Sequence, residues 1–290
     1  INGGIAWTDH NTNLQITQFY HGSISPSDPD MALGGSQDNG TAKWSGTNAW
    51  RLIFGGDGAD SAIASNNPTN YWALSYQNLE IRRTRNAGAN FEDAIAGIGT
   101  AGRPFIGRFD KSPHNDDIFL TGTTTIWKTT NFFSGATVAW SANSPDFGFG
   151  YRSAAFAPSD PTDSIYAVGL SGGLMRLTSD GGANWRDLDP LNNVPNRSVY
   201  DLAFNPANAN ILYACLSGVS GGAPANVYRT TNALAATPVW VNVSYPVDVS
   251  ANTLALDQDA PNILYAGTDI GVWRTADGGT TWVHMGPEVG

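Results

Sequence analysis

A short pattern recurs six times along the chain and constrains its fold more than any other feature. In each copy, a turn rich in proline, aspartate and asparagine precedes a run of aliphatic, aromatic and small residues. The copies end at Ala32, Ala73, Leu120, Ala167, Ala214 and Ala266. Repeats of about 40 to 50 residues, with short strand-like segments between turn signals, are typical of a β-propeller in which each repeat forms one blade.

Each repeat predicts four antiparallel strands, called A to D here from the centre outwards. In the last copy, Ile263–Gly267 reads as strand B and Gly271–Thr275 as strand C, and a tight hairpin closed by Trp282 leads into strand D. The small residues of strand A suit crowding around an axis, and the aromatic residues suit packing between blades. No amphipathic helical period of useful length is present, so we expect an all-β fold.

Residues 1–20 do not form a blade of their own. Gly3–Trp7 resembles a strand C, and Leu14–Phe19 resembles a strand D or the start of a strand A. The sequence therefore predicts a single β-propeller domain over residues 1–290, with six readable blades plus part of a seventh. We expect either a fragment of a longer secreted protein or a ring that closes with help from both termini.

The hairpin after strand C carries the most specific motif, Ser/Thr-x-Asp-x-Gly-x-x-Trp. Two copies fit at every position, and a third fits with conservative exchanges. Aspartate is expected to accept backbone N–H groups in the turn, glycine to permit a positive φ, and the aromatic ring to pack on the hairpin. The motif residues are Thr84, Asn86, Gly88 and Phe91, then Thr178, Asp180, Gly182 and Trp185, then Thr275, Asp277, Gly279 and Trp282.

These hairpins resemble the Asp-box, or bacterial neuraminidase, repeat. That repeat is shared by sialidases, sortilin-type receptor propellers, xyloglucan-active glycosidases and many secreted bacterial propellers. The resemblance covers nearly the whole chain and implies the propeller fold. It implies little about chemistry, because the boxes lie on the hairpin side, away from the usual ligand face. We expect them to be folding staples.

The opposite face of the ring is where a ligand site is expected, because B–C turns and D–A crossovers converge there on the channel mouth. Polar residues gather in three of these loops: Asp38 and Asn39 in the first B–C turn, Asp57 and Asp60 in the first crossover, and Gln77 in the second B–C turn. Neighbouring glycines let a ligand approach the backbone closely. The alternative interpretation is that these residues only satisfy tight turns.

Three arginines form a second candidate cluster. Arg103, Arg152 and Arg197 each precede or open a strand A in three consecutive blades. Three arginines around one carboxylate is the sialidase arrangement, and guanidinium pairs well with carboxylate. The sialidase Arg-Ile-Pro segment and its Tyr/Glu nucleophile pair are not identified here. Each arginine could instead form an ion pair with a neighbouring blade.

A glycoside hydrolase would need two carboxyl groups about 5–5.5 Å or about 6.5–9.5 Å apart beside a groove. Asp38, Asp57 or Asp60 would supply them, although no xyloglucanase-like catalytic segment is recognisable. The same oxygen-rich turns offer ligands to Ca²⁺, without the spacing of an EF-hand. No other cofactor and no metal site is expected.

Composition limits the partners. The chain has 15 basic and 25 acidic residues and a net charge of −10, which argues against nucleic acid and anionic membranes. No apolar stretch is long enough to span a bilayer. The single cysteine, Cys215, lies in an apolar run and is expected to be a buried strand residue.

Together these features predict a secreted or cell-surface propeller that binds a protein partner or a carbohydrate on its B–C/D–A face. The first alternative is a glycoside hydrolase with paired aspartates on that face. The second is a structural subunit of a surface assembly. We lean towards a function without catalysis.

Overall fold

The computed structural model describes residues 17–286, which form six four-stranded antiparallel sheets. Blade 1 is β1 (His21–Ile24), β2 (Ala32–Ser36), β3 (Gly40–Trp44) and β4 (Trp50–Phe54). Blade 2 is β5 (Gly58–Ile63), β6 (Trp72–Tyr76), β7 (Glu80–Thr84) and β8 (Glu92–Asp93). Blade 3 is β9 (Phe109–Lys111), β10 (Phe119–Gly122), β11 (Ile126–Thr129) and β12 (Ser141–Ala142).

Blade 4 is β13 (Tyr151–Phe156), β14 (Tyr166–Leu170), β15 (Met175–Thr178) and β16 (Arg186–Asp187). Blade 5 is β17 (Val199–Asn205), β18 (Asn208–Leu216), β19 (Val227–Thr230) and β20 (Trp240–Asn242). Blade 6 is β21 (Ala251–Leu256), β22 (Leu264–Thr268), β23 (Gly271–Thr275) and β24 (Val283–Met285). Two short 3₁₀ turns, η1 (Gln77–Leu79) and η2 (Ser171–Gly173), lie in B–C turns.

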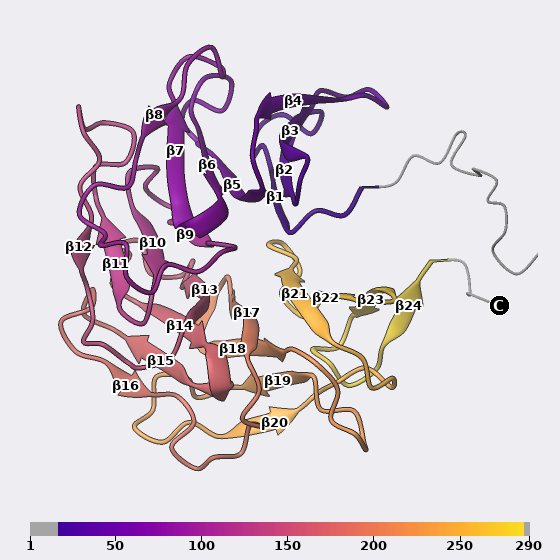
Figure 1. Ribbon diagram of the computed structural model, residues 1–290. Helices are drawn as coiled ribbons and strands as arrows, with labels where there is room; N and C mark the ends of the chain where they lie inside the picture. The colour runs from indigo at the N-terminus through magenta and orange to yellow at the C-terminus, as the bar shows by residue number, and fades with distance from the viewer. Residues whose placement is uncertain (1–16, 287–290) are drawn as a thin grey trace, which may run out of the picture.

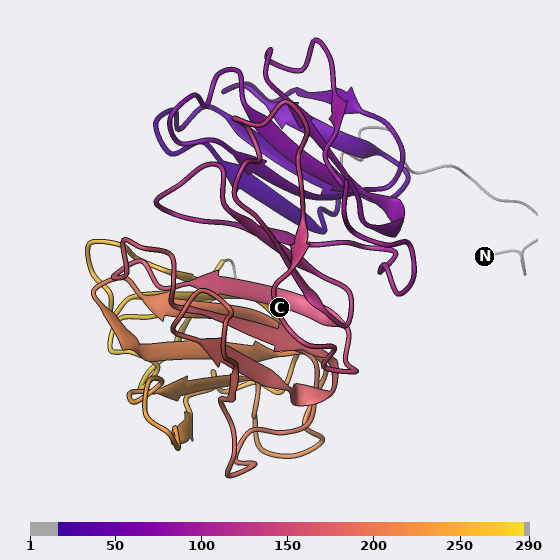
Figure 2. The same ribbon diagram turned by 90° about the vertical axis from the view of Figure 1, so that its left-hand side faces the viewer.

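The blades follow one another around a common centre, with the first strand of each innermost (Figures 1 and 2). Among the described residues this is a six-bladed β-propeller, as the repeats predicted. The predicted part of a seventh blade falls on residues outside the described range. No helix within residues 17–286 is long and apolar enough to cross a membrane.

Small residues on strand B let neighbouring blades approach closely. A Cβ on Gly35 would lie 2.6 Å from the carbonyl oxygen of Ala59 in blade 2, and one on Gly169 would lie 2.6 Å from Val199 of blade 5. Cys215 occupies the same strand-B position in blade 5, where it is fully buried. The hydrophobic core consequently lies between the blades; for example, Leu177 of blade 4 packs with Phe204 of blade 5.

The sequence alignment of the repeats was wrong by one residue in blades 1, 5 and 6. In blade 1, Leu33 pairs with Lys43 as Ala73 pairs with Arg83 in blade 2, so Leu33, not Ala32, is equivalent to Ala73. Tyr166 pairs with Thr178 across strands B and C, and Leu212 pairs with Thr230 in the same way. The residue equivalent to Ala167 is therefore Tyr213, not Ala214. By the same register, blade 6 places Tyr265 there instead of Ala266. The turn before strand B is shorter in blade 5, where Asn205 pairs with Asn208, than in blade 4, and this difference hid the shift.

The Thr-x-Asp hairpins have the local hydrogen bonds that were predicted. The Thr178 hydroxyl donates to Asp180 at 2.8 Å and accepts the Gly182 N–H at 2.9 Å. Asp180 also accepts hydrogen bonds from the Asn184 side-chain amide at 2.7 Å and from the Asn184 N–H at 2.9 Å. Mainly these two, and then the Thr178 hydroxyl, lower the pKa of Asp180 to about 2. Equivalent bonds hold the hairpins of blades 2 and 6.

The aromatic residue of the hairpin does more than close its own turn. In four blades the tryptophan indole N–H donates to a carbonyl oxygen of the preceding blade, just after that blade's strand D. The pairs are Trp140 with Ala94, Trp185 with Asn143, Trp240 with Leu188 and Trp282 with Val243, at 2.7 to 2.9 Å. Each hairpin therefore joins two blades.

Blades 6 and 1 do not meet as the other neighbours do. Five equivalent residues on strand C are fully buried against the next blade: Thr41, Ile81, Ile126, Met175 and Val227. Val272, the sixth, is 39% exposed. On the other side, Ile24 of β1 is 73% exposed, whereas its blade 5 equivalent Phe204 is 4% exposed.

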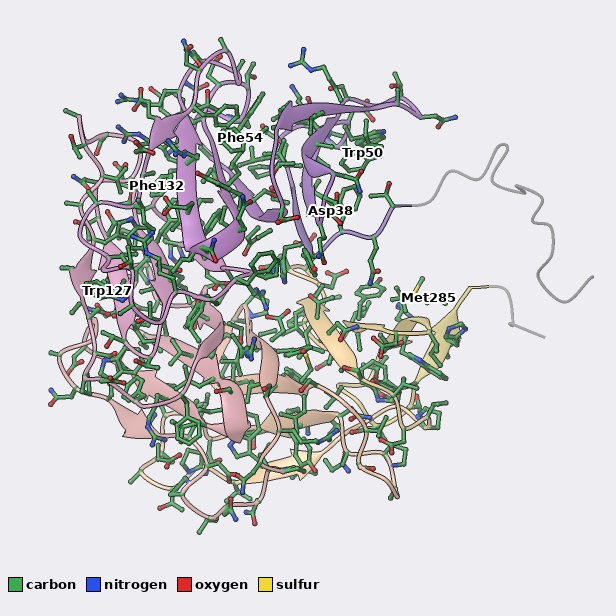
Figure 3. All side chains as sticks on the ribbon, viewed as in Figure 1. Asp38, Trp50, Phe54, Trp127, Phe132 and Met285 are labelled. Atoms are coloured by element: carbon green, nitrogen blue, oxygen red, sulfur yellow. The ribbon has the colours of Figure 1, made fainter. Side chains whose placement is uncertain are left out.

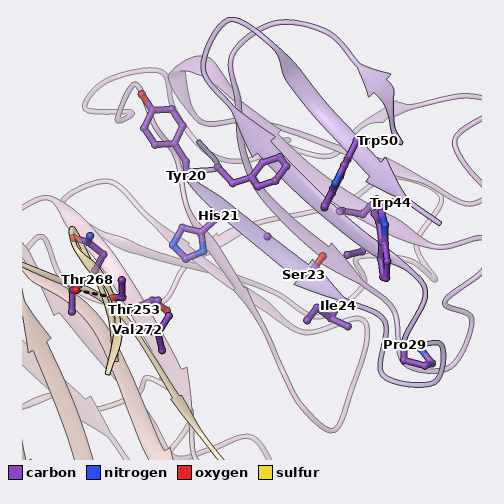
Figure 4. A pocket seen from close by; sticks show the side chains of 17 residues that line it. Tyr20, His21, Ser23, Ile24, Pro29, Trp44, Trp50, Thr253, Thr268 and Val272 are labelled. Carbon is purple, nitrogen blue, oxygen red and sulfur yellow. Dashed lines mark hydrogen bonds between the residues drawn. The ribbon is translucent and has the colours of Figure 1, made fainter. Parts of the chain in front are cut away.

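A cleft of about 910 Å³ lies between these two blades. It is lined by Ile24, Trp44 and Trp50 from blade 1 and by Thr253, Thr268 and Val272 from blade 6 (Figure 4). We call this cleft the seam. Trp50 and Met285, labelled in Figure 3, lie on the outer strands that border it.

Candidate functional site at the channel mouth

A cavity of about 430 Å³ lies where the inner strands of five blades begin. We call it the channel mouth. Because the starts of strands A and a B–C turn both contribute to it, it lies on the B–C/D–A face. Its lining residues are Gln18, Phe19, Tyr20, His21, Ile106, Arg108, Tyr151, Arg152, Tyr200, Asn252 and Asp269.

The rim of the channel mouth combines aromatic rings with one unpaired cation. Arg152 is exposed, and its guanidinium has no hydrogen-bond or ion-pair partner among residues 17–286. Tyr20, also exposed, donates its hydroxyl to Gln37. Asn252 donates to the carboxylate of Asp269 at 2.8 Å, which fixes a second polar point on the rim. Arg152 is thus available to an anionic group that enters the cavity.

Arg108 lies deeper in the channel, next to a buried carboxylate. Its guanidinium donates to the Tyr200 carbonyl at 2.6 Å and lies 4.0 Å from Asp60. The Arg108 Nε is buried and has no hydrogen-bond partner among the described residues. Arg108 was not among the site residues predicted from the sequence.

Three aspartates in the inner strands hold neighbouring blades together: Asp60 and Asp201 are buried, and Asp110 is half-buried. Asp60 accepts the Phe109 N–H of blade 3 at 3.2 Å, and Asp110 accepts the Ala154 N–H of blade 4 at 3.0 Å. Asp201 accepts the Leu254 N–H of blade 6 at 2.9 Å. Strand A is the inner edge of each sheet, so alternate N–H groups along it have no neighbouring strand to bond and can be satisfied by a side chain.

Burial dominates the electrostatics of this layer. It raises the pKa of Asp60 to about 6 and that of Asp110 to about 7, although the nearby positive charge of Arg108 opposes both shifts. Burial, and then Arg108, lowers the pKa of His21, so its ring is neutral at neutral pH. Tyr151 donates its hydroxyl to Asp110.

The predicted site residues Asp38, Asp57 and Gln77 do lie together. They bond to one another and thereby hold the loops in place. The Asp38 N–H donates to the Asp57 carboxylate at 2.9 Å, and the Asp57 N–H donates to the Gln77 side chain at 2.9 Å. Asp38 has a φ of 60°, so it occupies the left-handed region. Asn39 bonds to the carbonyl of Gln37 in the same turn. These contacts link two B–C turns through the crossover between them.

The three predicted arginines do not converge on one point. Arg103 pairs with Glu80 at 2.6 Å and donates to the carbonyls of Ile98 and Gly99. Arg197 donates to the carbonyls of Ser217, Gly218 and Ala225 and to the side chain of Asn226. Both arginines hold loops of the propeller itself. Only Arg152 lines the channel mouth.

Asp60, one of the aspartates predicted for a hydrolase site, is buried and fully hydrogen-bonded. Asp60 is 4% exposed, and both its oxygens accept N–H groups, from Ser61 at 2.7 Å and from Phe109. It therefore lies beneath the cavity instead of beside an open groove. Within residues 17–286 no group of three or more His, Cys, Asp or Glu side chains is arranged to hold a metal ion.

Neither a protein-family model nor a curated protein matches this sequence. Solved structures do resemble it. The GH74 xyloglucanase from Xanthomonas campestris superimposes with a TM-score of 0.71 at 18% identity, over 94% of this chain and 46% of that one. This chain thus spans less than half of the xyloglucanase.

Two smaller proteins are also similar in structure. YCF48 bound to D1 peptide gives a TM-score of 0.62 at 15% identity, over 92% of this chain and 82% of that one. Sqt1 from Chaetomium thermophilum, bound to the N-terminus of the ribosomal protein L10, gives a TM-score of 0.63 at 15% identity. The match covers 91% of this chain and 73% of Sqt1. At these identities the shared property is the fold alone. It is the β-propeller.

Proposed function

We propose that this protein is a binding module that holds a segment of a partner protein at the channel mouth. Arg152 carries the proposal, because it is an exposed cation in a cavity and has no partner among the described residues. A guanidinium forms strong paired hydrogen bonds with a carboxylate. The expected ligand is therefore a peptide segment that presents an acidic side chain or a chain-terminal carboxylate to Arg152.

The aromatic lining supports a peptide rather than a free anion. Tyr20 and Tyr200 flank the cavity, and Phe19 and Ile106 add apolar surface. Tyrosine provides a large contact area with few torsions to immobilise, which favours recognition of extended segments. We therefore expect apolar residues next to the acidic one in the ligand.

The loops around the mouth are already fixed by their own contacts, which reduces the entropy lost on binding. Asp57 connects two B–C turns through its side chain and its N–H, and Arg197 holds the B–C loop of blade 5. On this proposal, Asp38, Asp57 and Gln77 shape the rim, and Arg152 contacts the ligand. YCF48 and Sqt1, two propellers similar in fold, have been solved with bound peptide segments.

A glycoside hydrolase has less support. The GH74 xyloglucanase is similar in fold, but Asp60 is buried and committed to backbone N–H groups, and Asp57 holds the turn that contains Asp38. Membership of the Asp-box propellers is part of our proposal and is supported by the hydrogen bonds of the Thr-x-Asp hairpins. A secreted or cell-surface location is likewise proposed, on the basis of the composition.

Selection from a random peptide display library tests the binding function. Peptides that bind the wild-type protein should be enriched in acidic residues flanked by apolar ones. Arg152→Ala should weaken the binding of a selected peptide by at least about tenfold, since a charge-assisted pair contributes about 1.5–3 kcal/mol. Arg51→Ala is the matched control, because Arg51 is an exposed arginine on the outer strand of blade 1.

A glycan array and a hydrolysis assay on the bound glycans test the alternative. Binding or cleavage of a glycan that is lost in Asp57→Asn but unchanged in Arg152→Ala would contradict the peptide proposal. Selected peptides whose binding is equally affected by the Arg152 and Arg51 substitutions would also contradict it.

A further inference from the structure

Blade 5 holds the hairpin of blade 6 in a cradle made by two side chains. Arg229 donates to the carbonyl oxygen of Gly278 at 3.0 Å, and the hydroxyl of Tyr213 lies 3.5 Å from the same oxygen. Tyr213 and Arg229 are directly opposite each other on strands B and C. The cradle therefore contacts the first glycine of the Asp-Gly-Gly segment that begins at Asp277.

Blade 6 carries the same pair on the face that borders the seam. Tyr265 and Arg274 are opposite each other on β22 and β23, at the positions that Tyr213 and Arg229 have in blade 5. Arg274 has no hydrogen-bond or ion-pair partner among residues 17–286 and lies over the Tyr265 ring at 6.0 Å. Tyr213 is 2% exposed, whereas Tyr265 is only partly buried. Within the described range, this second cradle is empty.

The N-terminal sequence contains a segment that matches what the cradle holds. Asn2-Gly-Gly-Ile-Ala-Trp7 aligns with Asp277-Gly-Gly-Thr-Thr-Trp282 and with Asp180-Gly-Gly-Ala-Asn-Trp185, with asparagine in place of aspartate. The same exchange occurs in blade 2, where Asn86 accepts the expected hydrogen bonds. Residues 2–7 thus read as the end of a hairpin that leads into a strand D.

The length of chain that follows Trp7 agrees with this alignment. His21 of blade 1 occupies the strand-A position of Asp201 in blade 5 and Thr253 in blade 6. The stretch from Trp7 to His21 is longer than that from Trp240 to Thr253 and shorter than that from Trp185 to Asp201. A strand D and a D–A crossover of ordinary length therefore fit between Trp7 and blade 1.

We propose that residues 2–9 of this chain sit at the outer edge of the seam as the hairpin end and outer strand of a further blade, held by Tyr265 and Arg274, which lie outside the cleft lining. The Gly3 carbonyl takes the place that Gly278 has in the blade 5 cradle. The Trp7 indole N–H donates to the Met285 carbonyl, because Met285 lies three residues after Trp282 as Val243 lies three residues after Trp240. This places Trp7 at the start of a strand D, whereas the sequence analysis read Gly3–Trp7 as a strand C.

Such a hairpin can be held without inner strands of its own, because much of its contact is with the preceding blade. In blade 6, the Gly278 carbonyl, the Trp282 indole N–H and the Trp282 ring, which lies 5.9 Å from Tyr245, all reach blade 5. The occupant belongs to the same molecule, because the described chain enters β1 beside the seam, where the Tyr20 N–H bonds to Gly35 (Figure 1).

Hydrogen exchange of the tryptophan indole N–H groups, followed by NMR on the full chain, tests the proposal. Trp7→Phe, Trp185→Phe and Trp282→Phe assign the three resonances by their loss. We expect the Trp7 indole to exchange slowly, with protection comparable to that of Trp282. Arg274→Ala should remove most of the Trp7 protection and leave that of Trp185 unchanged. Arg51→Ala is the matched control and should change neither resonance.

Two results would overturn the proposal. The first is exchange of the Trp7 indole at the rate of a free indole, with no response to Arg274→Ala. The second is protection that appears only as the protein concentration rises, because a second copy would then supply the segment. Since the readout is one resonance in a folded protein, a loss of overall folding would appear separately as collapse of all the indole shifts.

Discussion

The indole N–H of Trp282 donates to the carbonyl oxygen of Val243 at 2.8 Å and joins blade 6 to blade 5. Trp282→Phe keeps most of the ring and removes this hydrogen bond. We expect the free energy of unfolding, measured by urea denaturation, to fall by about 0.5–1.5 kcal/mol or somewhat more, since the carbonyl loses its partner. Trp50→Phe is the control, because Trp50 is 43% exposed and its indole N–H has no hydrogen-bond partner among residues 17–286. Equal effects of both changes would contradict the staple role.

The half-buried Asp110 makes the free energy of unfolding depend on pH. Its folded pKa is raised to about 7, mainly by burial, so the folded state binds more protons than the unfolded state between about pH 4 and pH 7. Stability from this group is therefore fully present at about pH 4 and is lost as the pH rises through 7. Asp110→Asn should reduce this fall in the free energy of unfolding by up to about 4 kcal/mol. Urea denaturation of the wild type and of Asp110→Asn from pH 4 to pH 8 measures the difference. If the free energy of unfolding changed with pH in the same way in both proteins, the raised pKa of Asp110 would be contradicted.

Arg197 and Arg152 should differ in what they contribute. Arg197 donates to Gly218 and Asn226 at 2.9 Å, so Arg197→Ala should lower the free energy of unfolding by about 2–3 kcal/mol. Arg152→Ala should change it by less than about 0.5 kcal/mol, because Arg152 is exposed and unpaired among the described residues. Chemical denaturation of the two variants measures both losses in the free energy of unfolding. A larger loss for Arg152→Ala than for Arg197→Ala would exclude Arg152 as a free ligand-binding group.

Val227 and Val272 occupy equivalent strand-C positions with different surroundings. Val227 is fully buried against blade 6, so Val227→Ala should cost about 1.5–3 kcal/mol. Val272 borders the seam and is 39% exposed, and Val272→Ala should cost less than about 1 kcal/mol. A large cost at Val272 would mean that the inner part of the seam is filled in solution.

Much of the fold follows from local sequence signals. The six repeats and the Thr-x-Asp hairpins depend on contacts within a few residues, such as that of Thr178 with Asp180, and these patterns are visible in the chain. The partner of Trp185 was not predictable in the same way. Its indole bonds to Asn143, which lies in another blade, and only the packing of blades brings the two together.

The candidate site was less predictable, because side-chain direction decides it. Arg103, Arg152 and Arg197 have similar places relative to strand A, yet two of them turn back to bind their own loops. Arg108 was missed because it sits inside the strand pattern. Its signal was an unusual one, a cation at a strand-A position that is Ser153 in blade 4 and Thr253 in blade 6.

The channel mouth as a peptide site is the central claim, and hydrogen–deuterium exchange of the backbone with a selected peptide tests it most directly. Bound peptide should slow exchange around Tyr20, Arg152 and Tyr200, with no change in the Thr-x-Asp hairpins on the opposite face. Arg152→Ala should abolish the effect at the same peptide concentration. Protection confined to the hairpin face, or to Ile24 and Val272 at the seam, would contradict the claim.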